Sequence, residues 1–183
     1  MDFQNIFPFW EELSEKEQQI VSGSVLSQKM KKGDILHRGC GECSGIVHVA
    51  KGQLRVYIVS EEGREVTLYR IHEGELCVLS ASCLMDAIVF DVLIEAVQDS
   101  ELVVLPSPAL HEIMDTNHRV ELSLYKRVVE NFSDVMWTMQ QILFMGADKR
   151  VAYFLWDEMA KTGAPVIRLT HEEVARFIGS ARE

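Results

Sequence analysis

Four cysteines carry the most distinctive chemistry in this chain: Cys40, Cys43, Cys77 and Cys83. The first two form a Cys-x-x-Cys pair, and the second two bracket a segment that contains Ser80 and Ser82. Three interpretations are open: a thiol–disulfide switch in either pair, a metal or iron–sulfur site that uses all four, or small side chains that pack as hydrophobes. We treat these residues as effector or redox candidates and predict no particular cofactor or metal.

Other candidates for ligand binding are weaker. The six histidines show no ligand spacing among themselves. A cysteine site or a haem could recruit His37 or His72, although surface or core positions are the simpler interpretation for each. The apolar segment from Leu84 to Leu93 could instead line a pocket for a small hydrophobic ligand.

Composition narrows the class of protein. A chain of 183 residues with 48% hydrophobic content can bury a core, as one or two domains. It has no run of 18 apolar residues and no signal-peptide pattern at its start, so we expect a cytoplasmic protein without a membrane partner. The net charge is −10, but residues 146–183 carry 6 basic and 6 acidic side chains. That C-terminal part is therefore the less repulsive end for a polyanion.

The middle of the chain is predicted to be a β domain. Short strand-like runs separated by glycines predict an antiparallel sandwich or barrel. Gln53 to Ser60 and Glu65 to Ile71 form the clearest hairpin, because the first run alternates as a half-buried strand does. The other expected strands are Val25 to Lys29, Asp34 to His37, Gly45 to Ala50, Val92 to Ala96 and Ser100 to Pro106.

Helices are predicted on both sides of this region. Pro8 to Ser22 is the first, and Ser14 and Glu17 can form a capping box within it. Further helices are expected at Ser107 to Met114 and at Asp148 to Lys161. A last helix is expected to begin at a capping box of Thr170 and Glu173 and to end at Gly179, after a short strand from Val166 to Leu169.

The longest predicted helix runs from Asn117 to Met145. Apolar residues recur along it in steps of three and four, which is a heptad seam, at Tyr125, Val129, Phe132, Met136, Met139 and Leu143. A second apolar set, Val128, Val135 and Ile142, lies beside the first. We therefore expect one side of the helix to pack on the chain's own body and the seam to form a dimer interface, with an ordinary long core helix as the alternative.

The predicted fold is α+β in three parts. Residues 1–116 form an antiparallel, cupin-like β-roll with short flanking helices, residues 117–145 the dimerisation helix, and residues 146–183 the first part of a helix-turn-helix. The segment from Ile167 to Glu183 resembles the winged helix-turn-helix motif of the CRP/FNR superfamily of bacterial transcription regulators, in its strand, Thr, acidic pair, Gly, Ser and Arg-Glu. The runs 32–36, 49–56 and 71–75 resemble that family's cyclic-nucleotide-binding-type β-roll.

The resemblance implies a function and a set of site residues. It implies a homodimer, not an enzyme, that binds a palindromic DNA operator, senses a small effector and has RNA polymerase as a further partner. Arg182 and Glu183 match positions that read base edges, and Thr170 and Ser180 match positions near phosphates. The chain departs from the pattern by stopping at Glu183, within the expected recognition helix.

Cyclic AMP is not the expected effector. Members of the family that bind it hold its phosphate with an Arg-Ser pair, where this chain has Phe90 and Asp91, and no Lys or Arg occurs between Arg70 and Arg119. A phosphate buried without a cation would be unfavourable. The alternative to a regulator is a stand-alone cupin-like domain that binds a small ligand or a metal, although its histidines lack the paired spacing that cupin metal sites use.

Overall fold

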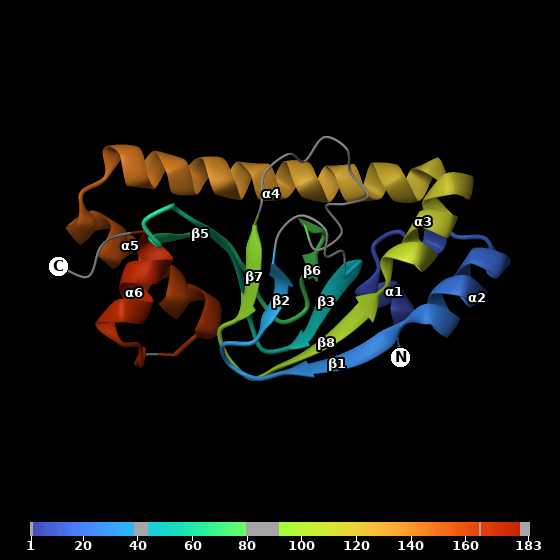
Figure 1. Cartoon of the computed structure of the whole chain (residues 1–183), viewed down its shortest axis with the longest axis horizontal. Coiled ribbons are helices and arrows are strands. Elements are labelled where there is room, and N and C mark those ends of the chain that lie inside the picture. The colour runs from blue at the N-terminus through green and yellow to red at the C-terminus, as the bar shows by residue number, and fades with distance from the viewer. Residues whose placement is uncertain (1, 39–43, 80–91, 165, 180–183) are drawn as a thin grey trace. The chain divides into compact units, whose positions relative to one another are not determined.

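The strands of this protein form an antiparallel β-roll. The structure is a computed structural model that describes residues 2–38, 44–79, 92–164 and 166–179 (Figure 1). Within these ranges, one sheet has the order β1-β8-β3-β6, made by Leu26–Met30, Ser100–Leu105, Ile46–Lys51 and Leu76–Cys77. The other has the order β2-β7-β4-β5, made by Ile35–Arg38, Leu93–Ala96, Leu54–Val59 and Glu65–Ile71. The α+β fold and the predicted hairpin are confirmed.

Close contact between strands explains one of the glycines. Gly52 follows β3 with a φ of 98°, a conformation that residues with a side chain rarely adopt. A Cβ atom at this position would lie 2.8 Å from the carbonyl oxygen of Asp99 and closer still to the Ser100 hydroxyl. The backbone between β3 and β4 can approach β8 because residue 52 has no side chain.

The register of the first sheet separates its two faces. Ile46 pairs with Leu105, and both belong to a buried cluster with Phe7, which follows α1, and with helical residues such as Leu110. Val47 pairs with both Val104 and Cys77, so these side chains share the opposite face, because paired residues point to the same side of a sheet. One face of the sheet therefore packs on helices and the other faces the interior of the roll.

The N-terminal helix is shorter than predicted. Instead of Pro8 to Ser22, the structure has α1 at Phe3–Ile6, a 3₁₀ turn at Trp10–Glu12 and α2 at Glu15–Ser24. The predicted capping box is present, and Ser14 has an extended backbone, with φ −65° and ψ 161°. An N-cap residue lies outside the helical region, so the cap that was recognised in the sequence also ends any helix before it.

The helices that follow the roll match the prediction closely. They are α3 at Ser107–Thr116, α4 at His118–Phe144, α5 at Ala147–Thr162 and α6 at His171–Ile178, and Figure 1 shows α4 as one unbroken helix. None of the helices in the described ranges is long and apolar enough to cross a membrane. Val166 to Leu169 is not a strand, which corrects the prediction, because a β-prone run needs a neighbouring strand for its hydrogen bonds.

The chain divides into two compact units. One comprises residues 1–56 and 70–132, and the other comprises residues 57–69 and 133–183. The outer part of the β4–β5 hairpin thus belongs to the same unit as α5 and α6. The long helix α4 contributes its first half to one unit and its second half to the other.

The Glu17 carboxylate fixes the start of α4 against α2. It accepts hydrogen bonds from the Ser14 backbone N–H at 2.7 Å, from the Thr116 hydroxyl at 3.1 Å and from the Asn117 amide at 3.2 Å. Burial favours the neutral acid, but the hydrogen bonds from Ser14, Asn117 and Thr116 outweigh it, and the pKa of Glu17 lies below its ordinary value. The charged form therefore stabilises the junction between α3 and α4.

We predict that Glu17→Gln lowers the free energy of unfolding by about 1.5–3 kcal/mol at pH 7, because four donors, two of them on Ser14, lose an ionised acceptor. A depressed pKa in the folded state gives stability that is present above the ordinary pKa of glutamate, about 4.3, and is lost as the pH falls through the folded value. Urea unfolding from pH 7 to pH 3 should therefore show the wild type converging on the variant. A constant difference across this range would contradict the role of the charge.

Candidate functional site

The helix α6 is framed at both ends by residues that the sequence predicts. The Thr170 hydroxyl accepts from the Glu173 backbone N–H at 3.1 Å, and the Glu173 carboxylate accepts from the Thr170 N–H at 2.8 Å. At the other end, Gly179 adopts the left-handed conformation with φ 63°. These two signals confirm the predicted capping box and the predicted end of the helix.

The helices α5 and α6 pack as a pair. The rings of Phe154 and Phe177 stack with their centroids 5.4 Å apart and an angle of 19° between their planes. The guanidinium of Arg150 donates to the Ile178 carbonyl at 2.7 Å. Helix α5 therefore supports the inner side of α6, which is the first helix of the predicted helix-turn-helix.

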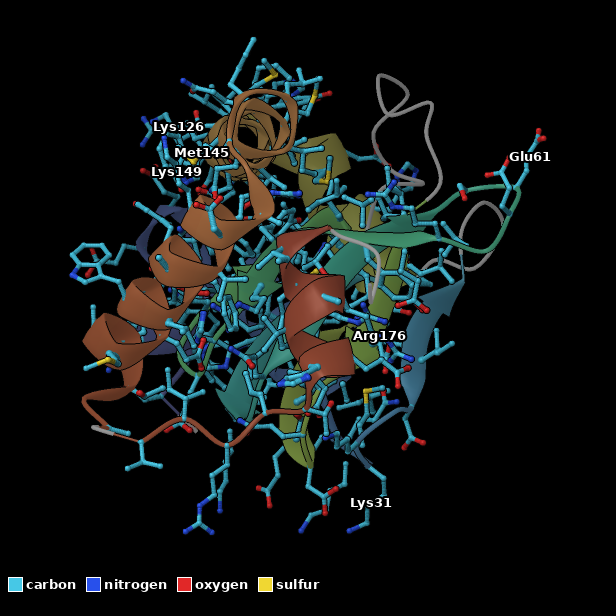
Figure 2. The ribbon with its side chains drawn as sticks, turned by 90° about the vertical axis from the view of Figure 1, so that its left-hand side faces the viewer. Lys31, Glu61, Lys126, Met145, Lys149 and Arg176 are labelled. Atoms are coloured by element: carbon cyan, nitrogen blue, oxygen red, sulfur yellow. The ribbon has the colours of Figure 1, made fainter. Side chains whose placement is uncertain are left out.

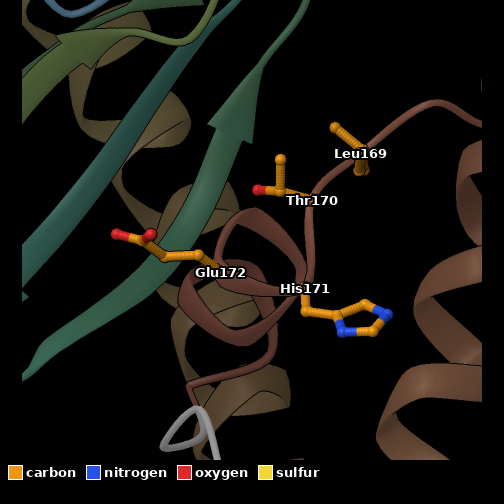
Figure 3. Close-up of a pocket in the computed structure, with 4 residues that line it drawn as sticks. All are labelled: Leu169, Thr170, His171 and Glu172. Atoms are coloured by element: carbon orange, nitrogen blue, oxygen red, sulfur yellow. The ribbon is translucent and has the colours of Figure 1, made fainter.

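The start of α6 borders a surface hollow of about 450 Å³, lined by Leu169, Thr170, His171 and Glu172. Figure 3 shows the His171 and Glu172 side chains pointing in different directions. The Thr170 hydroxyl also donates to Glu173 at 3.0 Å, so both of its hydrogen-bonding functions serve the cap. Its predicted position near a phosphate thus stays a prediction, whereas its capping role is a feature of the structure.

The other predicted DNA-binding residues follow directly in sequence. Ser180, Arg182 and Glu183 lie outside the described residues, which end at Gly179. The structure therefore shows the helix and the glycine turn that lead into the expected recognition helix.

The two faces of α4 differ as the sequence predicts. Val120 and Leu124 are buried, and Val128 packs against the helical part of the core. The heptad seam is instead exposed to solvent: Tyr125 by 40%, Val129 by 64%, Phe132 by 61%, Met136 by 45%, Met139 by 46% and Leu143 by 65%. At 27 residues and 1.5 Å per residue, this apolar stripe lies on a rod of about 40 Å.

Of the six effector or redox candidates, Cys77 is the one that the structure describes. It lies on β6, its side chain is 0% exposed, and its register partner is Val47. A thiol in such an apolar and inaccessible place packs as a small hydrophobe. The remaining candidates, Cys40, Cys43, Ser80, Ser82 and Cys83, and the first part of the proposed apolar pocket at 84–91 lie outside the described residues.

Two histidines of the roll, His48 and His72, have contacts in the structure. The His72 ring lies 3.0 Å from the Gln53 amide nitrogen. Burial lowers the pKa of His48, against the opposing effect of a hydrogen bond with the Gly74 backbone, so its ring is neutral at pH 7. Within the described part of the chain, no group of three or more His, Cys, Asp or Glu side chains could hold a metal ion.

One set of contacts, which joins the β4–β5 hairpin to α6, has no signal in the sequence. The guanidinium of Arg64 donates to the Gly179 carbonyl at 2.7 Å, and the Thr67 hydroxyl donates to the Arg176 carbonyl at 2.9 Å. These partners are separated by 115 and 109 residues along the chain. No local periodicity or cap signals such a pairing.

Comparison with known proteins identifies the domain type of the roll and the family of the whole chain. A family model of the cyclic nucleotide-binding domain matches residues 27–117. A solved structure from Eubacterium rectale, assigned to the CRP/FNR family of transcriptional regulators, is 41% identical, with a TM-score of 0.90. That match covers 96% of this chain and 82% of the other. A search of the curated proteins found no match.

More distant structures share the fold. The c-di-GMP-responsive global regulator CLP of Xanthomonas campestris is 15% identical, with a TM-score of 0.75 and coverage of 92% of this chain and 86% of its own. The catabolite activator protein of Thermus thermophilus is 22% identical, with a TM-score of 0.56 and coverage of 96% and 81%. At these identities the likeness concerns the fold and not the ligand.

We predict that Cys77 reacts with a thiol reagent at least about tenfold more slowly in the native protein than in urea, because its side chain is fully buried. The measurement uses a variant in which Cys40, Cys43 and Cys83 are replaced by Ser, so that Cys77 is the one thiol left to label. Equal rates in buffer and in urea would contradict the packing role and return Cys77 to the redox candidates.

Proposed function

Because this chain belongs to the CRP/FNR family of transcription regulators, we propose that it is a dimeric DNA-binding regulator that senses a small effector or a redox change through its β-roll. That family consists of regulators and not of enzymes. We assign the sensor to residues 1–116, dimerisation to residues 117–145 and the beginning of the DNA-binding domain to residues 146–183. The protein acts in the cytoplasm, where the chromosomal operator is found.

The exposed seam of α4 is the observation that carries this proposal. Large apolar side chains in water are unfavourable, and burying each one contributes about 1.5–3 kcal/mol. A contiguous exposed apolar stripe along one helix is typical of an interaction site. A second copy of the same helix offers a self-complementary stripe, so a two-fold symmetric dimer covers both at once.

The two-fold symmetry of the proposed dimer also predicts the symmetry of its DNA target. A dimer that carries one helix-turn-helix per chain matches a palindromic operator with half-sites about one helical turn apart. Arg182 suits the O6 and N7 atoms of guanine, and Glu183 can accept from the N4 amino group of cytosine. Thr170 and Ser180 lie near the phosphates in this proposal, and RNA polymerase is the partner through which binding changes transcription.

The signal that the roll senses is not cyclic AMP in this proposal. The family model describes a type of domain, and the chemistry of the ligand depends on the side chains of each member. Between Arg70 and Arg119 the chain has no Lys or Arg to neutralise a phosphate, and it carries Asp86 and Asp91, while the Glu95 carboxylate is already paired with the buried guanidinium of Arg55 at 2.6 Å. An effector without a phosphate, or a redox change at Cys40, Cys43 or Cys83, is compatible with this charge.

The signal reaches the DNA as a shift between two dimer states. A ligand moves such an equilibrium by as much as its affinity differs between the states. Because α4 contributes to both compact units, a change at its sensor half can alter the geometry of its output half. The helix is therefore both the dimer contact and the connection between signal and operator.

We predict that Phe132→Glu weakens the dimer at least tenfold, a loss of about 1.4 kcal/mol or more, because it places two carboxylates at the symmetric seam. Gln140→Glu is the matched control, since it adds one carboxylate to the same helix outside the seam. Sedimentation equilibrium should show one chain for the first variant and two for the control.

Operator affinity, measured by fluorescence anisotropy on the complete gene product, should fall with the dimer in Phe132→Glu and stay near the wild-type value in Gln140→Glu. A wild-type protein that sediments as one chain at micromolar concentration would contradict the proposed role of α4. Unchanged DNA affinity in a monomeric Phe132→Glu would contradict the link between the dimer and DNA binding.

A further inference from the structure

The exposed apolar stripe on α4 begins one turn before the heptad seam. Leu122 is 56% exposed and precedes Val129 by one heptad, so it continues the same stripe. The a positions of the heptad are then Leu122, Val129, Met136 and Leu143, and the d positions are Tyr125, Phe132 and Met139. This assignment also identifies the residues that flank the seam, at positions e and g.

One oppositely charged pair flanks the seam. The g positions are Glu121, Val128, Val135 and Ile142, and the e positions are Arg119, Lys126, Ser133 and Gln140. In two parallel helices, a g residue faces the e residue of the following heptad on the partner, where opposite charges form ion pairs between the chains. Glu121 is therefore matched with Lys126 of the partner subunit. The later g residues are apolar and form no such pair.

Both side chains are available to a partner. The Glu121 side chain is 38% exposed, and its carboxylate lies 3.6 Å from Nδ1 of His118. Lys126 is exposed, and Figure 2 shows it on the outer side of α4, away from the strands. The other charged e residue, Arg119, is instead bound by the Glu12 carboxylate of its own chain at 2.7 Å.

The g side of α4 borders the core of its own chain. Val128, one heptad after Glu121, packs against the buried cluster of the roll and its helices. A lysine that reaches Glu121 from the partner subunit would therefore bind at the edge of this core, where water screens the attraction less than on an open surface.

We infer that Glu121 and Lys126 form two ion pairs across the α4 dimer and that these pairs select a second copy of this chain as the partner. The inference rests on the proposed dimer. Apolar side chains give affinity for almost any similar stripe, whereas charges at the rim discriminate between partners. A chain with a different charge at either position would lose the pairs or meet a like charge.

The two-fold axis of the proposed dimer repeats the pair, so each change of charge acts twice. The pairing requires parallel helices, because Glu121 and Lys126 both lie in the first third of α4. In an antiparallel contact centred on the middle of the helix, Glu121 and Lys126 of the partner subunit would lie at opposite ends.

Charge reversal tests the pairs without removing any apolar residue of the seam. Glu121→Lys places like charges together in both halves of its homodimer, and so does Lys126→Glu. A mixture of these two variants can restore opposite charges in both halves by forming heterodimers. The double variant restores both pairs within its own homodimer, with the signs exchanged.

The experiment uses the complete gene product at low salt. Sedimentation equilibrium gives the Kd of each homodimer, and native mass spectrometry gives the composition of mixtures. Arg127→Glu is the matched control, because it makes the same charge change as Lys126→Glu at the next residue, on the side of α4 away from the seam. Its lost contact with Glu130, 3.0 Å long, lies within one chain.

The double variant also separates pairing from folding. Glu121 lies in the first turn of α4, where a carboxylate stabilises the helix by itself. Glu121→Lys and the double variant lose this stabilisation equally, but the double variant alone regains the ion pairs between the chains.

We expect each single reversal to weaken its homodimer at least about fivefold, and the double variant to return to within about twofold of the wild type. The loss should shrink at high salt. Arg127→Glu should dimerise as the wild type does. The two single variants should form heterodimers in excess over the half that random mixing gives, and the double variant should form few heterodimers with the wild type.

Single variants that dimerise as tightly as the wild type and mix at random would overturn the ion pairs and leave the proposed dimer standing. A double variant as weak as the single ones would also overturn them. A wild-type protein that sediments as one chain would overturn the pairs and the proposed dimer together. Selective mixing without operator binding by any of these proteins would support the pairs and contradict the proposed DNA-binding function.

Discussion

Helix α4 has apolar side chains on two sides, one buried in the protein and one exposed to solvent. The proposed mechanism depends on this arrangement. Toward the roll, Val120 and Leu124 are buried, and the Glu17 carboxylate ties the start of the helix to α2 through Thr116 and Asn117. On the other side, six large apolar side chains of the seam are exposed. A helix anchored in this way cannot rotate to hide its seam without exposing its buried residues. In the proposed dimer, a partner chain covers the seam.

Much of the fold could be predicted because its signals are local. A heptad period, a capping box or a left-handed glycine is encoded within a few neighbouring residues. The heptad residues from Tyr125 to Leu143 therefore predicted α4, and Thr170 and Gly179 predicted the two ends of α6. The capping box at Ser14 should also have shortened the predicted helix from Pro8 to Ser22, because an N-cap residue ends any helix before it. The two-residue strand β6 was missed because Leu76 and Cys77 are too few to show alternation.

The rest of the structure depends on partners that are distant in sequence. Val166 to Leu169 has the composition of a strand, but a strand forms where another strand accepts its hydrogen bonds. The contacts of Arg64 and Thr67 with the end of α6 use backbone carbonyls, which every residue has, so no residue type marks the partner. For the candidate site, the sequence left three interpretations of the cysteines open. The burial of Cys77 beside Val47 favours packing for that residue.

Counting the chains bound to one operator duplex is the most direct test of whether two copies joined along α4 read the DNA together. Native mass spectrometry of the complete gene product, mixed with a duplex that carries both half-sites, gives this count without assumptions about shape. We predict two chains on each duplex, with no appreciable species of one chain even when DNA is in excess. A single chain per duplex under the same conditions would contradict a regulator built on the α4 seam.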